Sequence, residues 1–455
     1  MDYILMHKDV KVLKFRLDDR DAFDNVIEIY DIKHIPFSTD RDLSFNHKAI
    51  REWWADRSIP LSRNDYSLIK EVLTNDDSLS LVVKSHALSL DDQYWIKKED
   101  EDINYDDISF FSNDFNNDIG DILVGIKDSG PIDYYSPDST SNGNLKKRWK
   151  NINGVKYLLK AGTKPNQYEI FNEIIASKVM TLLNIDHVDY ELIIDNGHIY
   201  SASKNFISYN EDLVSAYQLR YSKKQTNHTS LYCHLLSIYS QLDIPEYKKK
   251  IDQMLFIDYL LGNEDRHLNN FGVIRDAKTL KFLRVAPIYD TGSCLGYNLK
   301  DEALTHLYHV EWKPFMSQQV RSQLELINDF SWLDIKVLKA IPHEVDDLLT
   351  KYDTYISPNR RKAINKFLIG RINNILSYID STERIDEVLE FHSLPLLEEE
   401  ILEYVEKKGK LVDLDTLIKR TGKAYITIYR AVSNLTNDGY LIRVGSRKTG
   451  YWILA

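Results

Sequence analysis

The stretch that decides the fold covers residues 261–296 and reads LGNEDRHLNNFGVIRDAKTLKFLRVAPIYDTGSCLG. Its first half carries Asp265, His267 and Asn270 in the pattern D-x-H-x-x-N, followed by an apolar Phe-Gly-Val-Ile run. Its second half places Asp290 in the turn Tyr-Asp-Thr-Gly, just after an Ala-Pro break. The segment between the two halves predicts a short β-hairpin, so the polar residues flank a compact connection.

This order of side chains suits one kind of chemistry. Phosphoryl transfer needs a carboxylate to orient the attacking hydroxyl and accept its proton, and an amide plus a second carboxylate to hold Mg²⁺ against the nucleotide phosphates. Protein kinases place the first two groups five residues apart and the third after a hairpin, as Asp265, Asn270 and Asp290 are placed. His267 shares the loop and is counted with the catalytic residues. The alternative is a solvated turn, with Asn270 as a helix cap and Asp290 as an ordinary turn carboxylate.

Two upstream segments supply the remaining groups that such a site needs. Residues 155–160 (VKYLLK) are typical of a strand and end in Lys160, while apolar residues recur with helical period over 167–183. A strand lysine holds the α- and β-phosphates when a helix glutamate orients it. We choose Glu173 for this role and keep Glu169, one turn earlier on the same side, in reserve. Taken alone, Lys160 would be read as a solubilising charge at a strand end.

The nucleotide would be covered by the turn-rich residues 139–143, Ser-Thr-Ser-Asn-Gly. Small residues there let backbone N–H groups approach phosphate oxygens, so we place Ser141, Asn142 and Gly143 beside the nucleotide. A simple hairpin turn fits the same residues equally well. Lys204 and Phe206 lie where a hinge between two lobes would offer backbone groups to adenine. ATP and Mg²⁺ are the predicted cofactors.

Size and composition set the outer limits. A chain of 455 residues allows about two to four domains. Its net charge of −11 argues against nucleic-acid binding by the chain as a whole, so any such activity must be local. The cysteines, Cys233 and Cys294, are too few for a disulfide framework, and Cys294 is interpreted as a small core residue. With no signal-peptide pattern and no run long enough to span a bilayer, we expect a cytoplasmic protein.

Residues 1–121 predict an N-terminal α+β domain with helices around 43–56 and 63–73. We expect Trp53, Trp54 and Trp95 to pack it together. The neighbouring arginines are expected to form surface salt links, with stacked Arg–Trp pairs that bind nucleotides or protein tails as the alternative; they are Arg51, Arg57 and Arg63. The acidic stretch 97–121 reads as a linker or a solvated loop region.

The last part of the chain, residues 396–455, predicts three short helices followed by a two-stranded hairpin, with Asp413 capping the second helix and Gly422 in the next turn. Three helices closed by such a wing resemble a winged helix-turn-helix domain. Its third helix would present basic and polar side chains to a major groove, and its wing would bring two more to the phosphates. The candidates are Lys423, Tyr425, Thr427 and Arg430 on the helix side, and Arg447 and Lys448 on the wing. A protein-docking winged helix is the alternative.

Together, the segment Asp265-Arg-His-Leu-Asn-Asn270, the APIYDTG loop with Asp290, Lys160 and Glu173 resemble HipA-type serine/threonine kinases over roughly residues 130–380. The resemblance implies an α+β, bilobal protein-kinase-like fold, with an N-lobe over 122–208 and a helical C-lobe over 209–385. It also implies ATP, Mg²⁺ and phosphorylation of a protein hydroxyl, with the roles given above.

Members of that family often act as toxins of toxin–antitoxin systems, and some phosphorylate an aminoacyl-tRNA synthetase. They can be silenced by phosphorylation of a serine in their own phosphate loop, for which Ser139, Thr140 and Ser141 are the candidates here. The leading hypothesis is therefore a Ser/Thr kinase with its own DNA-binding domain, acting on a protein of translation and partnered by operator DNA and an antitoxin. The rival is a DNA-binding transcriptional or recombination regulator whose kinase-like region senses nucleotide without turnover.

Overall fold

The computed structural model describes residues 1–36, 47–60, 78–126, 131–140, 145–223, 225, 229–304, 314–315, 323–389, 396–437, 440–445 and 450–454. These residues fall into two compact units, 1–374 and 375–455. The finer division at 121, 208 and 385 stays a prediction.

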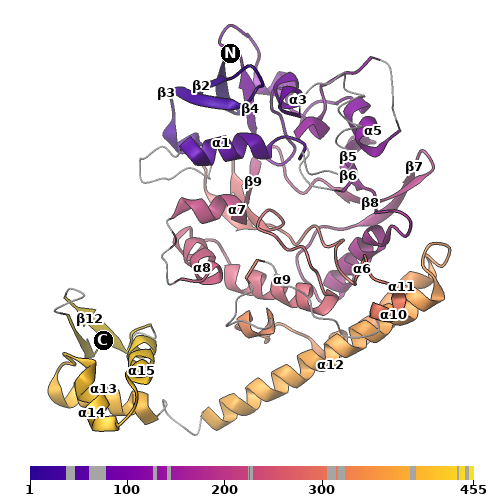
Figure 1. The fold of residues 1–455 in the computed structure, drawn as a ribbon. Coiled ribbons are helices and arrows are strands. Elements are labelled where there is room, and N and C mark those ends of the chain that lie inside the picture. The colour runs from indigo at the N-terminus through magenta and orange to yellow at the C-terminus, as the bar shows by residue number, and fades with distance from the viewer. Residues whose placement is uncertain are drawn as a thin grey trace. The chain divides into compact units, whose positions relative to one another are not determined.

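The elements follow one another along the chain as Figure 1 labels them. The strands are β1 (Asp2–His7), β2 (Val10–Leu17), β3 (Phe23–Ile29), β4 (Tyr94–Lys97), β5 (Lys147–Ile152), β6 (Val155–Lys160), β7 (Glu191–Asp195), β8 (His198–Lys204), β9 (Glu211–Ser215), β10 (Gly272–Asp276), β11 (Phe282–Val285), β12 (Leu441–Val444) and β13 (Tyr451–Leu454). The α-helices are α1 (His47–Asp56), α3 (Ser78–Lys84), α4 (Tyr105–Ile108), α5 (Asp118–Val124), α6 (Tyr168–Leu182), α7 (Ala216–Leu219), α8 (Leu231–Gln241), α9 (Tyr247–Leu261), α10 (Asp301–Leu304), α11 (Ile335–Thr350), α12 (Pro358–Leu389), α13 (Leu396–Lys408), α14 (Leu414–Thr421) and α15 (Tyr425–Asn437). Short 3₁₀ turns are η1 (Ile32–His34), η2 (Pro137–Thr140), η3 (Arg220–Ser222) and η4 (Gln323–Leu326).

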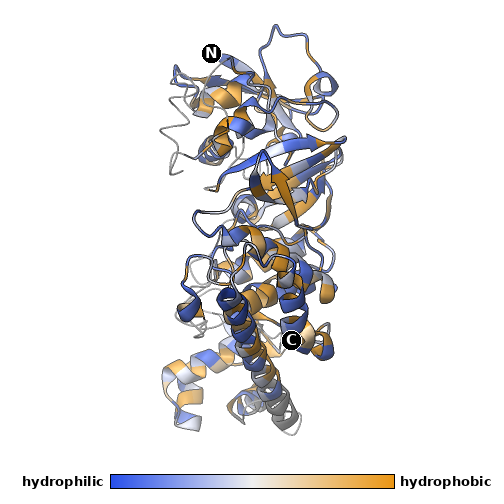
Figure 2. Cartoon of the chain, turned by 90° about the vertical axis from the view of Figure 1, so that its right-hand side faces the viewer, coloured by the Kyte–Doolittle hydropathy of each residue, from blue (hydrophilic) through white to orange (hydrophobic). Residues whose placement is uncertain are grey.

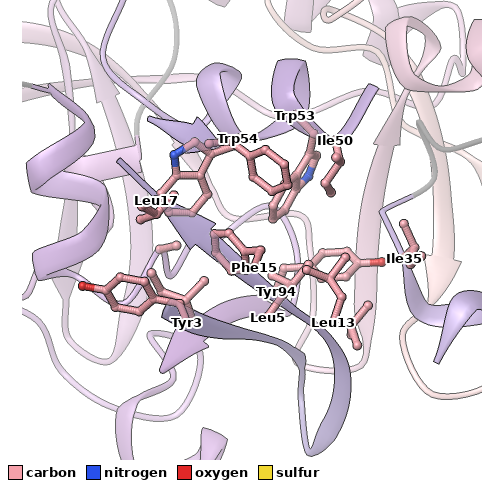
Figure 3. Packing of buried hydrophobic residues seen from close by; sticks show 14 of the residues in the cluster. Tyr3, Leu5, Leu13, Phe15, Leu17, Ile35, Ile50, Trp53, Trp54 and Tyr94 are labelled. Carbon is pink, nitrogen blue, oxygen red and sulfur yellow. The ribbon is translucent and has the colours of Figure 1, made fainter. Parts of the chain in front are cut away.

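The first sheet is antiparallel in the order β3-β2-β1-β4, and α1 packs on one of its faces. Figure 3 shows this core, in which Trp53 and Trp54 of α1 meet Phe15 and Tyr94 of the sheet. Phe15 and Trp54 lie edge to face with ring centroids 5.6 Å apart, and Trp53 and Tyr94 do so at 5.5 Å. Such pairs contribute about 0.5–1.5 kcal/mol each beyond their buried area. The aromatic residues thus hold α1 to the sheet.

The three tryptophans pack both faces of this sheet, with Trp53 and Trp54 on one face and Trp95 on the other. Successive side chains of a strand point to opposite faces, and Trp95 follows Tyr94 directly. It packs in a separate cluster with Ile4, Phe110 and Trp149. Because Trp149 comes from β5, this second face joins the N-terminal sheet to the next one.

The acidic stretch 97–121 is not a linker, since it forms α4 and the first part of α5. Tyr105 and Phe110 within it are fully buried. Some of its acids lie at helix starts, and among them Asp107 accepts a hydrogen bond from the Asn104 N–H (3.3 Å) and completes a capping box. The acidic composition of this stretch therefore does not indicate a linker, because capping acids surround buried aromatic residues there.

Arg57 is buried, which corrects the expectation of a surface salt link. Its Nη1 lies 2.7 Å from an oxygen of Asp92, and its Nη2 donates to the Ala87 carbonyl at 2.6 Å. The guanidinium carbon stacks 4.8 Å from the centre of the Trp53 ring. The stacked Arg–Trp pair exists, but the cation is used to fasten α1 to the loop before β4. Residues 61–77, with Arg63 and the second predicted helix, lie outside the described part.

The second sheet runs β5-β6-β8-β7, all antiparallel, with α6 packed against it. The predicted strand 155–160 is β6, and the predicted helix 167–183 is α6. The hairpin expected around Asp195-Asn-Gly is the turn between β7 and β8. This sheet brings Lys160, at the end of β6, opposite Ser201 of β8 and Lys147 of β5.

The third sheet, β11-β10-β9, carries the predicted hairpin, because β10 and β11 pair antiparallel. Before it, α9 ends at Gly262, whose φ of +65° is the left-handed helix ending that glycine favours. At the start of β10, a Cβ on Gly272 would lie 2.3 Å from the Val214 carbonyl, so only glycine fits there. These two glycines lie on either side of the D-x-H-x-x-N loop. Gly272 allows the end of the loop to lie close to β9.

The C-terminal unit has its own core, built by α13, α14 and α15 with the antiparallel pair β12–β13. The core side chains are Ile401, Val405, Leu417, Ile428 and Leu435. As predicted, the Asp413 carboxylate caps α14 by accepting the Thr416 N–H at 2.9 Å, and Gly422 follows the helix with φ +66°. The winged helix-turn-helix assignment stays a prediction.

Helices long and apolar enough to cross a membrane are absent from the described residues. Figure 2 agrees with this, because hydrophobic and hydrophilic residues are interspersed along each helix.

Candidate active site

Three of the predicted residues meet in one ion-pair chain. The Lys160 ammonium lies 2.7 Å from Glu173 of α6 and 2.7 Å from Asp290. Glu173 also accepts the Ser201 hydroxyl. Glu169, the reserve candidate, instead accepts the Thr163 N–H at 3.1 Å. The structure thus places Glu173, and not Glu169, against the lysine.

Burial and charge act in opposite directions on these groups. Burial alone would lower the pKa of the Lys160 ammonium, but the Asp290 and Glu173 carboxylates raise it well above its usual value. Burial would raise the pKa of Asp290, yet the charges of Lys160 and Lys147 hold it well below its ordinary range. For Glu173, burial dominates and the pKa is raised. The lysine and Asp290 are therefore the firmly charged pair.

Tyr190 adds a neutral contact to this pair. Its hydroxyl accepts the backbone N–H of Asp290 at 3.2 Å, and its ring centre lies 5.4 Å from the Lys160 ammonium. Burial raises the pKa of the phenol, so it stays protonated. Asp290 has a backbone φ of +56° at this point.

The D-x-H-x-x-N loop holds its residues through its own backbone. The Asn270 side-chain nitrogen donates to the Asp265 carbonyl at 2.9 Å, and the Asn270 backbone N–H donates to the His267 carbonyl at 2.8 Å. The side chains of Asp265 and His267 are half exposed and lie 4.0 Å apart at their closest nitrogen and oxygen. Asp265 is therefore reachable by a hydroxyl group, while Asn270 is fixed.

Most of these groups line one cavity of about 490 Å³, while Glu173 lies behind Lys160 and does not line it. Lys160 and Asp290 line it together with Asp265, His267 and Asn270. Lys204 and Phe206, the predicted hinge residues, also line it. The structure thus brings the predicted catalytic, metal and hinge residues to a single opening.

The phosphate-loop candidates are placed only in part. Thr140 lines the cavity and donates its hydroxyl to the Leu88 carbonyl at 2.8 Å. Ser139 is fully buried and donates to the Tyr134 carbonyl at 3.2 Å. Ser141, Asn142 and Gly143 lie outside the described residues.

The DNA-binding candidates lie in the other unit. Lys423, Tyr425, Thr427 and Arg430 are all exposed at the start of α15. Arg447 and Lys448 fall outside the described residues.

Sequence reasoning missed a buried polar cluster beneath the loop, formed by Asp258, Asn263 and Arg266. Arg266 makes two contacts of 2.9 Å with Asp258 and donates to the carbonyls of Asn270 and Tyr289. The sequence offered no signal that would separate Arg266 from an exposed arginine of the same loop.

Two further residues were missed. Lys147 of β5 lines the cavity directly across from Lys160, and a basic run around it was the available signal. Asn172 of α6 donates to the carbonyls of Gly292 (3.1 Å) and Cys294 (2.6 Å), which ties the Asp290 loop to the helix that carries Glu173. Cys294 is fully buried, in agreement with its interpretation as a core residue.

The residues present fit a magnesium–nucleotide complex. Because the Asn270 nitrogen is engaged by the Asp265 carbonyl, its oxygen is left as an acceptor, and the Asp290 side chain is about one-third exposed (36%). Two oxygen ligands plus phosphates are what Mg²⁺ commonly uses. No group of three or more His, Cys, Asp or Glu side chains among the described residues forms an all-protein metal cage.

Part of the chain is similar in sequence to known proteins. Residues 139–345 match the family model of the HipA-like C-terminal domain. The serine/threonine-protein kinase CtkA of Helicobacter pylori (strain J99) is 27% identical over 280 residues, which are 58% of this chain and 79% of CtkA.

Solved structures were compared as well. A structure of the Helicobacter pylori proinflammatory kinase CtkA is 18% identical, covering 52% of this chain and 95% of that one, with a TM-score of 0.42. The Shewanella oneidensis MR-1 toxin–antitoxin system HipA, HipB and operator DNA complex contains a chain that is 12% identical, with 83% of this chain and 98% of that chain covered and a TM-score of 0.51.

Fold and site together define an α+β protein with a kinase-like fold. Over residues 139–345, the chain is similar to the family of the HipA-like C-terminal domain.

Proposed function

We propose that this protein is an ATP- and Mg²⁺-dependent serine/threonine protein kinase. The observation that carries the proposal is the chain Glu173–Lys160–Asp290, which faces Asp265 and Asn270 across one cavity. The relationship to a serine/threonine kinase supports it.

The chemistry follows from the placement of the groups. When bound, ATP supplies the γ-phosphoryl group and Mg²⁺ neutralises phosphate charge. Lys160, oriented by Glu173, binds phosphate oxygens, and Lys147 across the strand pair adds a second cation. Asn270 and Asp290 present oxygens to the metal. Asp265 orients the attacking hydroxyl and accepts its proton, and positioning and electrostatics supply most of the rate enhancement.

Radiolabel transfer from γ-labelled ATP tests the proposal. We expect Asp265→Ala and Asp290→Ala to abolish transfer to the protein itself and to added protein substrates while the circular dichroism spectrum is unchanged. Transfer that persists in a folded Asp290→Ala protein would refute the assignment.

Self-phosphorylation in the phosphate loop belongs to the same proposal. Thr140 lines the cavity, whereas Ser139 is enclosed, which favours Thr140 among the described candidates. Ser141 completes the set. Mass spectrometry of protein incubated with ATP locates the phosphate, and the Asp265→Ala protein is the control.

The C-terminal unit is proposed to bind DNA through the exposed start of α15. Exposed Lys423 and Arg430 supply cations, and the stacked rings of Tyr425 and Tyr429, 6.3 Å apart, supply contact area. A chain of similar fold belongs to a complex of a toxin–antitoxin system with its operator DNA, which supports operator DNA and an antitoxin as partners. A toxin role, acting on a component of translation, is part of the same proposal. A gel shift with upstream DNA of its own gene, with Lys423→Glu/Arg430→Glu protein as control, tests the DNA part.

This gel shift, run beside the transfer assay, also separates the kinase from a purely regulatory protein. Tight DNA binding with no ATP consumption would favour a regulator whose kinase-like region only senses nucleotide.

A further inference from the structure

The candidate site rests on one buried polar cluster, which we call the anchor cluster: Asp258, Asn263 and Arg266. Asp258 belongs to the last turn of α9, and the other two residues follow in the loop. Their exposed fractions are 0%, 2% and 1%. None of the three lines the cavity, so they do not touch a bound nucleotide.

Arg266 connects the two loops that carry the metal-ligand candidates. Its Nη1 donates to the Asn270 carbonyl at 2.8 Å and to the Tyr289 carbonyl at 2.6 Å. The first carbonyl belongs to one ligand candidate, and the second belongs to the residue bonded to Asp290. One nitrogen therefore sets the backbone separation of both ligands.

Asn263 holds the backbone of Asp265, the residue with the proposed catalytic carboxylate. Its side-chain oxygen accepts the Asp265 N–H at 3.3 Å, and its side-chain nitrogen donates to Asp258 at 2.8 Å. Each of the three active-site residues is thus anchored through a backbone group, either its own or its neighbour's.

Asp258 fixes the orientation of the Arg266 guanidinium group. Its two carboxylate oxygens accept Nε and Nη2, both at 2.9 Å, so Nη1 is left facing the two carbonyls. A bidentate pair is planar and directional, and the single ammonium of a lysine does not reproduce it. The charge of Arg266 also reaches Asp290 and favours its ionised form, which burial alone would oppose.

We propose that Arg266, oriented by Asp258, is a positioning residue that sets Asn270 and Asp290 at the separation required to bind the metal–nucleotide complex, and that Asn263 positions Asp265. This inference rests on the proposed kinase function. It adds a division of labour inside the anchor cluster: Arg266 governs metal use, and Asn263 governs the transfer step.

The central test compares Arg266→Lys with the matched control Arg275→Lys. Arg275 is equally buried (1%) and paired with Asp212 at 2.8 Å, but its contacts lead away from the site. We measure melting temperature, binding of the non-hydrolysable analogue AMP-PNP with and without Mg²⁺ by calorimetry, and phosphate transfer over a Mg²⁺ series. Replacing groups that orient metal ligands costs about 10–100-fold in metal affinity or activity.

Arg266→Lys is expected to bind AMP-PNP normally without Mg²⁺, to lose about 10–100-fold of the Mg²⁺-dependent gain in affinity and to need correspondingly more Mg²⁺ for transfer. Arg275→Lys is expected to lower the melting temperature while keeping the native Mg²⁺ response. An unchanged Mg²⁺ response in folded Arg266→Lys, or an equal change in both variants, would overturn the proposal.

Asn263→Ala removes no buried charge and serves as a second variant. It is expected to lower kcat by about 10-fold with the Mg²⁺ requirement unchanged. A shifted Mg²⁺ requirement with native kcat would contradict the division of labour. Failure of the kinase proposal is distinct, because native protein would then neither transfer phosphate nor bind AMP-PNP more tightly with Mg²⁺.

Discussion

Arg266 and Arg275 lie nine residues apart and are equally buried. Each is 1% exposed and paired with one aspartate, at 2.9 Å for Asp258 and 2.8 Å for Asp212. They differ in where their other hydrogen bonds end. Arg266 donates to two backbone carbonyls of the site loops, whereas Arg275 donates to the Tyr94 hydroxyl at 3.1 Å.

The Arg275 pair fastens two sheets together. Asp212 of β9 also contacts the His7 ring at 3.0 Å and accepts the Gln93 N–H at 3.0 Å, so it links the N-terminal sheet to β9 and β10. The burial of an ion pair does not by itself reveal what the pair does in the protein. Its role is set by the groups that its remaining donors and acceptors reach, which belong to the candidate site in one case and to the junction between two sheets in the other.

The largest effect is expected for Asp258→Ala. It leaves the Arg266 charge buried without its partner, which costs about 3–5 kcal/mol of stability. It also frees the Arg266 guanidinium from its fixed orientation toward the two loops. The rate of phosphate transfer should then fall by about 100-fold or more, because small misplacements of reacting groups cost that much. Urea unfolding and radiolabel transfer per folded molecule measure the two losses. A native rate of phosphate transfer in folded Asp258→Ala protein would contradict the proposed difference between the Arg266–Asp258 pair and the Arg275–Asp212 pair.

Asp212→Ala should cost a similar 3–5 kcal/mol, about the cost of stranding one partner of a buried pair. Transfer per folded molecule should stay native, because the contacts of Asp212 lead to His7, Gln93 and Arg275 and not to the cavity. The same two assays apply. A loss of transfer as deep as in Asp258→Ala would show that the junction between the two sheets also positions the site.

The stability that the Asp212–Arg275 pair contributes is expected to depend on pH. Burial would raise the pKa of Asp212, but the charges of His7 and Arg275 hold it well below its usual range. A carboxyl with a depressed folded-state pKa stabilises the fold above its unfolded pKa of about 4 and loses that contribution as pH falls below it. Native protein should therefore lose stability below about pH 4, and Asp212→Asn should lose less over that range. Parallel curves of unfolding free energy against pH for both proteins would contradict this.

The smallest effect is expected for Arg16→Ala. Arg16 contacts Asp2 at 2.7 Å at the surface, where solvent screens the pair. The melting temperature and the transfer rate should both stay at native values. A clear loss of stability would mean that exposed pairs matter here as much as the two buried ones.

Much of the site could be predicted because its chemistry imposes a spacing. Asp265, Asn270 and Asp290 were identified from their order around a hairpin that β10 and β11 form. The choice between Glu173 and Glu169 needed the structure, because both lie on the same side of α6 and only packing decides which reaches Lys160.

Arg266 could not be singled out, since a sequence does not show whether an arginine is buried. The sequence also did not show which face of the first sheet Trp95 would cover. Its face depends on the register of β4 against β1, and a one-residue shift sends a side chain to the other side of the sheet.

The positive φ of Asp290 has a practical consequence for mutagenesis. Aspartate and asparagine tolerate the left-handed region, whereas alanine is strained there by about 1–2 kcal/mol. A loss of transfer in folded Asp290→Ala protein would therefore combine the loss of the carboxylate with local backbone strain. Asp290→Asn keeps the backbone shape and the side-chain volume, so it is the substitution that isolates the contribution of the negative charge.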